Sequence, residues 1–290
     1  MDYDYIKNLW EKALIDLLNL KLDGEVINVL TLQTIDSVKR IEIYELYESR
    51  AKKADESNLS YFHSSNPFTL AQRTSLSLKN RLWYIYLATY FGKSNKSGWT
   101  LFMRTSFRHD STLIGLEEII DSRDSYYSYL DSIDLFKDTS YSNHRKYTKK
   151  SLHGRKGLIC SMDYFLDNID IFCHEDFQDF DTIYRNALNI PNFGRMAAFD
   201  FTSSLSKCKL NVNEPTQMYH EQSTGPLQAL EEILVLANCK DISKTTKVDF
   251  GNRLLSWFVE NSEIFFIAQV LEDAICNWQK SSKKYIRYFG

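Results

Sequence analysis

The spacing of apolar residues along the chain predicts helices almost throughout. Over residues 3–22, apolar side chains recur every three or four positions, which is typical of an amphipathic helix. The same reasoning predicts helices over 36–54, 69–79, 82–91, 116–136, 158–188 (as a pair), 196–205, 227–237, 247–261 and 262–281. Residues 25–33 form a short apolar run that fits either a helix or a strand. We therefore expect an all-α fold.

Helix-breaking residues are scarce and stand where helices should begin or end. The 290 residues include only 10 Gly and 4 Pro, and both types interrupt helices. Asn66 followed by Pro67 indicates a helix start, with the asparagine as cap and the proline in the first turn. Gly92 is a plausible end for the apolar helix before it, and Trp99 opens the next helix.

Composition and charge exclude several classes of protein. The net charge of -3 rules out a uniformly basic nucleic-acid coat, so any anion-binding surface must come from local clustering. The five cysteines are widely spaced without a C-x-x-C pair, which predicts reduced thiols rather than disulfides, zinc or iron–sulfur ligands. The six histidines show no metal-ligand spacing. We expect no metal and no cofactor.

The apolar stretches are too short to span a bilayer, and the N-terminus has neither a basic flank nor an apolar signal segment. These observations predict a cytoplasmic protein without a membrane partner. Nothing in the chain predicts an obligatory protein partner.

Residues 139–157 differ from the rest because no acid occurs between Asp138 and Asp163. This basic run predicts a loop between an N-terminal helical region, 1–138, and a C-terminal one, 158–290, which together form one composite domain. A charge run is usually a solvated face, but a long acid-free gap in an acidic protein favours DNA binding. The candidate phosphate contacts are Asn143, His144, Arg145, Lys146 and Tyr147.

The segment 190–195, Ile-Pro-Asn-Phe-Gly-Arg, carries most of the functional inference. With Ala197 and Ala198 after it, the segment fits a helix-hairpin-helix turn, whose backbone N–H groups can bind a DNA phosphate at a helix N-terminus. Asn192 stands where glycine is usual, and asparagine tolerates a left-handed conformation. We expect Asn192, Gly194 and Arg195 to hold the phosphate. The alternative is an ordinary corner between two helices. Lys93 is a further candidate contact, although a cation after a helix end is favourable anyway.

Two carboxylates are candidates for catalysis. Asp200 lies on the helix after the turn, and Glu214 lies twenty residues after Gly194. An aspartate among apolar helix residues is costly to bury without a purpose, although Asp200 could simply pair with an arginine. Glu214 could be a solvated loop acid. The sequence does not choose between them.

Several stretches together resemble the alpha-glutamyl/putrescinyl thymine pyrophosphorylase family, clade 3. The resembling segments are 66–73 (Asn-Pro-Phe-Thr-Leu-Ala-Gln-Arg), 91–93 (Phe-Gly-Lys) with Gly98-Trp99, 143–147 (Asn-His-Arg-Lys-Tyr), 193–200 (Phe-Gly-Arg-Met-Ala-Ala-Phe-Asp), 223–227 (Ser-Thr-Gly-Pro-Leu) and 271–278 (Leu-Glu-Asp-Ala-Ile-Cys-Asn-Trp). The chain departs from the expected pattern at Ser94, where His is expected, and at Gln228-Ala229, where two small residues are expected.

This family is similar to helix-hairpin-helix DNA glycosylases and is linked to hypermodified phage bases. Proteins resembling it include phage-defence glycosylases that act on glucosylated cytosine. The resemblance implies an all-α, glycosylase-like fold with two helical subdomains flanking a cleft. We place the base pocket at six residues: Arg73, Trp99, Thr224, Gly225, Glu272 and Asp273. Some of them have structural alternatives, because Arg73 could pair with an acid and one of the two acids could pair with Arg195 or Arg73.

The leading hypothesis is therefore a monofunctional DNA glycosylase that acts on double-stranded phage DNA. It would excise a hypermodified pyrimidine, such as glucosylated 5-hydroxymethylcytosine, and leave an abasic site in antiviral defence. One alternative is a pyrophosphorylase or transferase that makes hypermodified thymine. The other is a helix-hairpin-helix module that binds DNA without catalysis.

Overall fold

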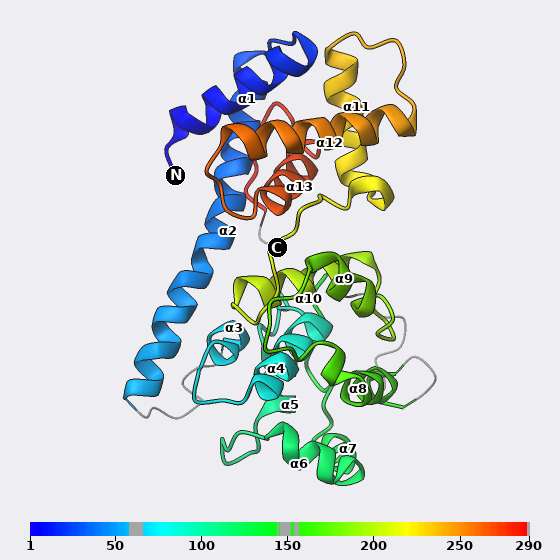
Figure 1. Ribbon diagram of the computed structural model, residues 1–290. Coiled ribbons are helices and arrows are strands. Elements are labelled where there is room, and N and C mark those ends of the chain that lie inside the picture. Colours follow the sequence, from blue (N-terminus) through cyan, green and yellow to red (C-terminus); the bar gives the residue numbers. More distant parts are fainter. Residues whose placement is uncertain (58–65, 144, 146–151, 154–156, 289–290) are drawn as a thin grey trace. The chain divides into compact units, whose positions relative to one another are not determined.

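The computed structural model describes residues 1–57, 66–143, 145, 152–153 and 157–288. The chain is all-α, as predicted: the described ranges contain thirteen α-helices joined by turns and short 3-10 segments (Figure 1). In these ranges extended backbone pairs only in isolated bridges, such as Gln178 with Val212. None of the described helices combines the length and apolar character needed to cross a membrane.

The chain forms two compact units, which are described separately. Unit 1 comprises Met1–Ile43 and Pro215–Gly290, and unit 2 comprises Tyr44–Glu214. The boundaries therefore fall at 43/44 and 214/215, away from the basic run at 139–157 where the sequence suggested a division. The first boundary lies inside one continuous helix, α2 (Gly24–Glu56), whose two ends belong to different units. The ambiguous run 25–33 is the helical beginning of α2.

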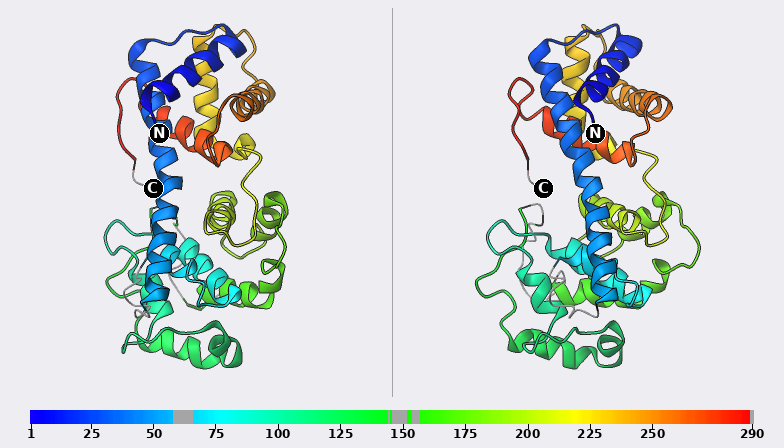
Figure 2. Two further views of the ribbon diagram at one scale, coloured as in Figure 1. Left: turned by 60° about the vertical axis from the view of Figure 1, so that its left-hand side comes forward. Right: turned by 90° about the vertical axis from the view of Figure 1, so that its left-hand side faces the viewer.

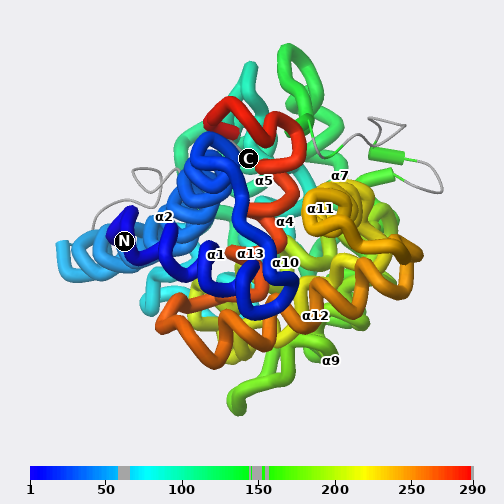
Figure 3. Tube along the Cα trace, turned by 90° about the horizontal axis from the view of Figure 1, so that it is seen from above, coloured from blue at the N-terminus to red at the C-terminus, as the bar shows by residue number. Residues whose placement is uncertain are grey.

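Unit 1 is a bundle of amphipathic helices around one apolar core. It contains α1 (Tyr3–Leu18), the first part of α2, α11 (Thr224–Leu236), α12 (Lys244–Asn261) and α13 (Ile267–Trp278). α12 packs on α1, α11 and α13 (Figures 1 and 3). Trp10, Phe258 and Trp278 are fully buried in this core, and the Trp10 indole donates a hydrogen bond to Thr34 Oγ1 at 2.8 Å. The apolar spacing of residues 3–22 is thus explained by the buried face of α1.

Unit 2 is built around α4 (Leu78–Phe91), which is buried on every side. All residues from Leu82 to Phe91 are buried, so the continuous apolar run reflects a helix enclosed by others rather than an amphipathic surface helix. α3 (Pro67–Ala71), α5 (Thr100–Ser106), α6 (Leu116–Asp121) and α10 (Arg195–Lys207) pack on α4, and α9 (Phe180–Ala187) packs on α10. α7 (Arg123–Ser132) and α8 (Leu158–Asp167) complete the unit.

Local sequence signals set several helix boundaries. Asn66 caps α3 as predicted, with its Oδ1 accepting hydrogen bonds from the backbone N–H groups of Phe68 and Thr69. The predicted helix over 69–79 is wrong, because α3 ends at Ala71 and α4 starts anew at Leu78, capped by Ser77. α4 ends at Gly92, which has φ +61° and confirms the predicted C-cap.

Candidate functional site

The turn between α9 and α10 has the conformation that the sequence predicts for a hairpin. Asn192 has φ +71°, the left-handed conformation for which glycine would be usual. Its side-chain amide donates a hydrogen bond to the Tyr90 hydroxyl at 3.0 Å, so the turn is tied to α4. Burial raises the pKa of Tyr90 to about 12, against the opposing effect of the bond from Asn192, and the phenol stays protonated at neutral pH.

The N-terminus of α10 is open to a ligand. Gly194 occupies the N-cap position, and within the part of the chain that the structure describes no side-chain cap hydrogen bond is formed there. Gly194 is exposed, and a Cβ built on it would meet no atom within 4 Å. Arg195 follows as the first helical residue and is partly exposed. This geometry leaves backbone N–H groups and the helix dipole available to an anion.

An ion pair between Arg145 and Asp200 is the most distinctive feature of unit 2. Arg145 Nη2 lies 2.5 Å from Asp200 Oδ2, and Arg145 Nε donates to the Thr89 carbonyl at 2.7 Å. The arginine side chain is 7% exposed, whereas the aspartate side chain is 44% exposed. A buried guanidinium thus fixes a carboxylate that still reaches solvent, which is the arrangement that a carboxylate needs to act on a substrate.

The backbone around Gly92 brings Arg145 to this position. The backbone N–H of Ser142 donates to the Phe91 carbonyl at 3.0 Å, so the segment leading to Arg145 docks on the end of α4. A Cβ on Gly92 would lie 2.4 Å from Ser142 Oγ and 3.2 Å from Arg145 Cγ. Only glycine allows this close approach, and its positive φ adds a second requirement.

Four partly exposed rings, Tyr44, Tyr47, Phe68 and Trp99, form what we call the aromatic cluster. The Phe68 ring is the centre: its centroid lies 5.1 Å from Tyr44, 6.1 Å from Tyr47 and 5.8 Å from Trp99. The Lys207 ammonium stands 4.8 Å from the centroid of the Tyr44 ring. Partly exposed aromatic rings can stack on a planar base.

Tyr44 of the aromatic cluster lies close to α10, the helix that carries Asp200. Desolvation raises the pKa of Tyr44 well above its ordinary value, with a smaller upward contribution from the nearby Asp200 charge, while a hydrogen bond with Ser204 lowers it. Asp200 and Ser204 are four residues apart and so share a face of α10. The Lys207 ammonium, on the same helix, stands 4.8 Å from the Tyr44 ring centroid, so Tyr44 of α2 lies close to α10.

The other residues expected to bind DNA are distributed differently. Lys93 and Asn143 are exposed on unit 2. Arg145 was expected to contact phosphate, but it is buried and engaged with Asp200 and Thr89. The predicted contacts His144, Lys146 and Tyr147 lie outside the described residues.

The second candidate carboxylate, Glu214, is exposed in the irregular segment after Val212. It is not part of the ion pair that fixes Asp200. Asp200, by contrast, lies on the helix that follows the hairpin turn and is held by Arg145.

The residues proposed for a base pocket fall in both units. In unit 2, Trp99 belongs to the aromatic cluster, whereas Arg73 is buried and pairs with Asp55, Nε to Oδ1 at 2.6 Å. Arg73 thus pairs with an acid on α2, which is the alternative to a place in the base pocket that the sequence left open. Asp273 pairs with Arg40, Oδ2 to Nε at 3.6 Å, and the alternative that one of Glu272 and Asp273 pairs with Arg195 or Arg73 stays a prediction.

Three further pocket candidates lie in unit 1 with Asp273. Thr224 is exposed at the start of α11, and Glu272 is buried on α13. A Cβ on Gly225 would lie 2.7 Å from Cys276 Sγ, so this glycine permits close packing of α11 on α13. The close approach to Cys276 therefore gives Gly225 a structural role in the contact between α11 and α13.

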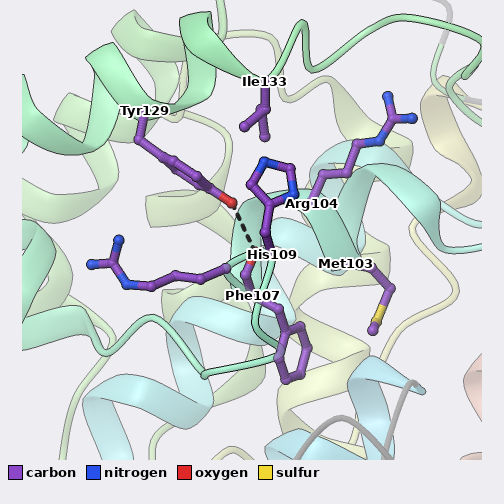
Figure 4. Close-up of a pocket in the computed structure, with 7 residues that line it drawn as sticks. Met103, Arg104, Phe107, His109, Tyr129 and Ile133 are labelled. Atoms are coloured by element: carbon purple, nitrogen blue, oxygen red, sulfur yellow. Dashed lines mark hydrogen bonds between the residues drawn. The ribbon is translucent and has the colours of Figure 1, made fainter.

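Unit 2 also has a separate surface pocket of about 360 Å³, lined by Met103, Arg104, Phe107, Arg108, His109, Tyr129 and Ile133 (Figure 4). Arg104 donates to the carbonyls of Leu135 and Lys137, and Arg108 pairs with Glu118. The guanidinium groups are thus engaged with protein acceptors. The pocket includes none of the residues of the hairpin turn or the aromatic cluster. Within the described residues, no three His, Cys, Asp or Glu side chains gather to hold a metal ion.

Sequence reasoning missed the contribution of Tyr44, Tyr47, Phe68 and Gly92. Tyr44 and Tyr47 lie three positions apart on α2 and so share a face, and Phe68 follows the cap and the proline of α3. These spacings could have indicated paired rings, but not that the two helices meet.

The family model for alpha-glutamyl/putrescinyl thymine pyrophosphorylase, clade 3, matches residues 25–290 of the chain. The curated proteins and the solved structures give no significant match.

Proposed function

Because the chain belongs to the alpha-glutamyl/putrescinyl thymine pyrophosphorylase family, clade 3, we propose that it acts on a hypermodified pyrimidine in double-stranded DNA, and that it excises the base. The observation that carries the proposal is the Arg145–Asp200 pair beside an open hairpin turn. Phage DNA with bulky modified bases, such as glucosylated 5-hydroxymethylcytosine, is the proposed substrate, and antiviral defence is the proposed role.

The proposed reaction divides the site into three parts. The N-terminus of α10, with Gly194 and Arg195, holds a backbone phosphate next to the target nucleotide. The aromatic cluster stacks on the base once it leaves the duplex. The Asp200 carboxylate faces the sugar, where positive charge develops as the base departs.

The chemistry is hydrolysis of the N-glycosidic bond. The bond from C1′ to the base breaks, its electron pair leaves with the base, and the sugar becomes oxocarbenium-like. Asp200 stabilises that charge and accepts a proton from the water that adds to C1′, while the departing base takes up a proton from solvent. The products are a free modified base and an abasic site. Arg145 is a positioning residue, since it contacts Asp200 rather than substrate.

The family name favours a second candidate, in which the protein takes part in making hypermodified thymine as a pyrophosphorylase. Such a reaction needs an amine or nucleotide co-substrate and leaves the glycosidic bond intact. A hydrolytic glycosylase needs only water.

One experiment separates the two reactions. The protein is incubated with phage genomes that carry glucosylated cytosine or hypermodified thymine and with unmodified DNA, without co-substrate. Strand breaks that appear only after alkali, together with a free modified base by mass spectrometry, are the expected result. Intact DNA on every modified genome would refute excision, and pyrophosphate release or an altered base still attached to DNA would favour the second candidate.

The matched controls are Asp200→Asn and Asp176→Asn. Asp176 is an exposed loop aspartate of the same unit. Excision should be lost in the first variant and retained in the second, whereas loss in both would point to a general effect of removing charge.

A further inference from the structure

The segment after α13 combines exposed cations with a fixed backbone. Lys280, Lys283, Lys284 and Arg287 are all exposed, and no acid occurs between Asp273 and Tyr288. The whole chain has a net charge of -3, so the chain without these four cations carries -7. A local cluster of cations in an acidic protein is typical of a surface that binds an anionic partner.

We call residues 279–288 the basic tail; three hydrogen bonds fix it against α2 within unit 1. Gln33 Nε2 donates to the Ile286 carbonyl at 2.8 Å, and Arg40 Nη1 donates to the Tyr288 carbonyl at 3.1 Å. The Tyr285 hydroxyl donates to Asp36 Oδ2 at 2.6 Å. Figures 2 and 3 show the tail (red) running beside α2 (blue). The tail is thus held in place although it forms no helix.

The acids near the tail are engaged on the protein side. Asp36 is buried and faces Tyr285, and burial together with this carboxylate raises the pKa of the Tyr285 phenol to about 12, so the phenol remains a donor. Asp273 pairs with Arg40, and Glu232 accepts a hydrogen bond from Ser282 Oγ at 2.6 Å. These three carboxylates are thus in contact with Tyr285, Arg40 and Ser282.

The exposed ammonium groups differ in how far they are engaged. Lys280 donates to Asn277 Oδ1 at 2.8 Å and stands 4.5 Å from the centroid of the Tyr288 ring. Lys283 and Lys284 have no side-chain partner among the described residues. A fixed backbone that presents unpaired lysines matches a phosphate backbone, because little chain entropy is lost when the anion binds.

We propose that the basic tail is a second DNA-binding surface, on unit 1, that contacts backbone phosphates without reading sequence. This proposal rests on the proposed function in one respect only, namely that the polyanion bound by the protein is DNA. The tail would add affinity for DNA that does not depend on its sequence or on base modification.

The test measures affinity rather than excision. Binding of a short unmodified duplex is followed by fluorescence anisotropy over a range of salt concentrations, for the wild type and for Lys283→Ala/Lys284→Ala. If each lysine contacts one phosphate, the slope of log K against log salt becomes less negative by about 1.8, and affinity at about 0.1 M salt falls at least about tenfold.

Lys240→Ala/Lys244→Ala is the matched control, since it removes two exposed lysines from the same unit, one on the connection between α11 and α12 and one at the start of α12. Its slope should equal that of the wild type. An unchanged slope in the tail variant would overturn the proposal, as would equal losses in both variants. Unchanged DNA binding with lost binding to phosphatidylserine vesicles would assign the tail to a membrane surface instead. Because this assay measures only binding to an unmodified duplex, its result can be told apart from failure of excision on modified DNA.

Discussion

Replacing Asp200 by asparagine separates its chemical role from its structural one. The substitution keeps an oxygen that can accept from Arg145 but removes the charge opposite a guanidinium that is 7% exposed. Removing one partner of a fully buried pair costs about 3–5 kcal/mol. Since the aspartate side chain is 44% exposed, water already screens the pair, and we expect a loss of about 1–2 kcal/mol. That corresponds to a fall in Tm of about 2–8 °C.

The reverse substitution, Arg145→Met, should cost more, about 2–3 kcal/mol, for a different reason. It leaves the Thr89 carbonyl without the 2.7 Å hydrogen bond from Arg145 Nε, whereas the exposed Asp200 carboxylate can recruit water. The double variant should be less destabilised than the two single losses combined, because the partners interact directly.

Urea unfolding of the four proteins measures the coupling, and single-turnover base release on modified DNA measures the chemistry. Asp200→Asn should remain folded at 25 °C and release base at least about a hundredfold more slowly. If the folded variant releases base at the wild-type rate, the catalytic assignment of Asp200 is refuted. If its stability is unchanged, the reasoning about the buried cation is refuted instead.

Four further substitutions, one of them a control, probe the surroundings of the candidate site and the stability of unit 2. Gly92→Ala should lower the free energy of unfolding by more than about 1–3 kcal/mol and slow base release, because the new Cβ meets Ser142. Gly98→Ala is the control: with φ +57° and open space around the new Cβ, it should show the effect of backbone strain alone in thermal unfolding. Trp99→Ala should weaken binding of an extruded base by about 1–3 kcal/mol in a titration with mismatched DNA, and unaltered affinity would exclude the ring from the base site. Asp55→Asn should make the free energy of unfolding depend less on pH in the acid range. Burial raises the pKa of Asp55 in the folded state, but hydrogen bonds from Ser75 and Arg73 outweigh that effect and lower it. Its contribution is therefore complete above about pH 4 and lost as pH falls further, so urea midpoints of the wild type should drop more steeply there than those of the variant.

Local signals in the sequence predicted local structure well. The all-α fold, the Asn66 cap and the left-handed Asn192 each follow from the intrinsic preferences of a few neighbouring residues. The helix predicted over 69–79 failed because apolar periodicity alone did not reveal the new start at Ser77, which caps α4.

The site depended on contacts between distant segments, which periodicity cannot supply. Arg145 appeared as one cation in a basic run, yet it is buried against Thr89 and Asp200, which are 56 and 55 positions away. The aromatic cluster likewise joins rings from α2, α3 and the start of α5. The division into units was hidden for the same reason, since its first boundary lies in the middle of a continuous helix.

The order of segments in unit 1 has a consequence for synthesis of the chain. Residues 1–43 belong to that unit, but the helices that cover α1 and the start of α2 come from residues 215–290. Between them the ribosome must add the 171 residues Tyr44–Glu214, which takes about 10–35 s at usual rates. During that interval Trp10 and its apolar neighbours lack the partners that later bury them, while unit 2 is already complete in sequence. The nascent chain is therefore most exposed to aggregation at its beginning, and co-translational chaperones should bind α1 rather than the candidate site.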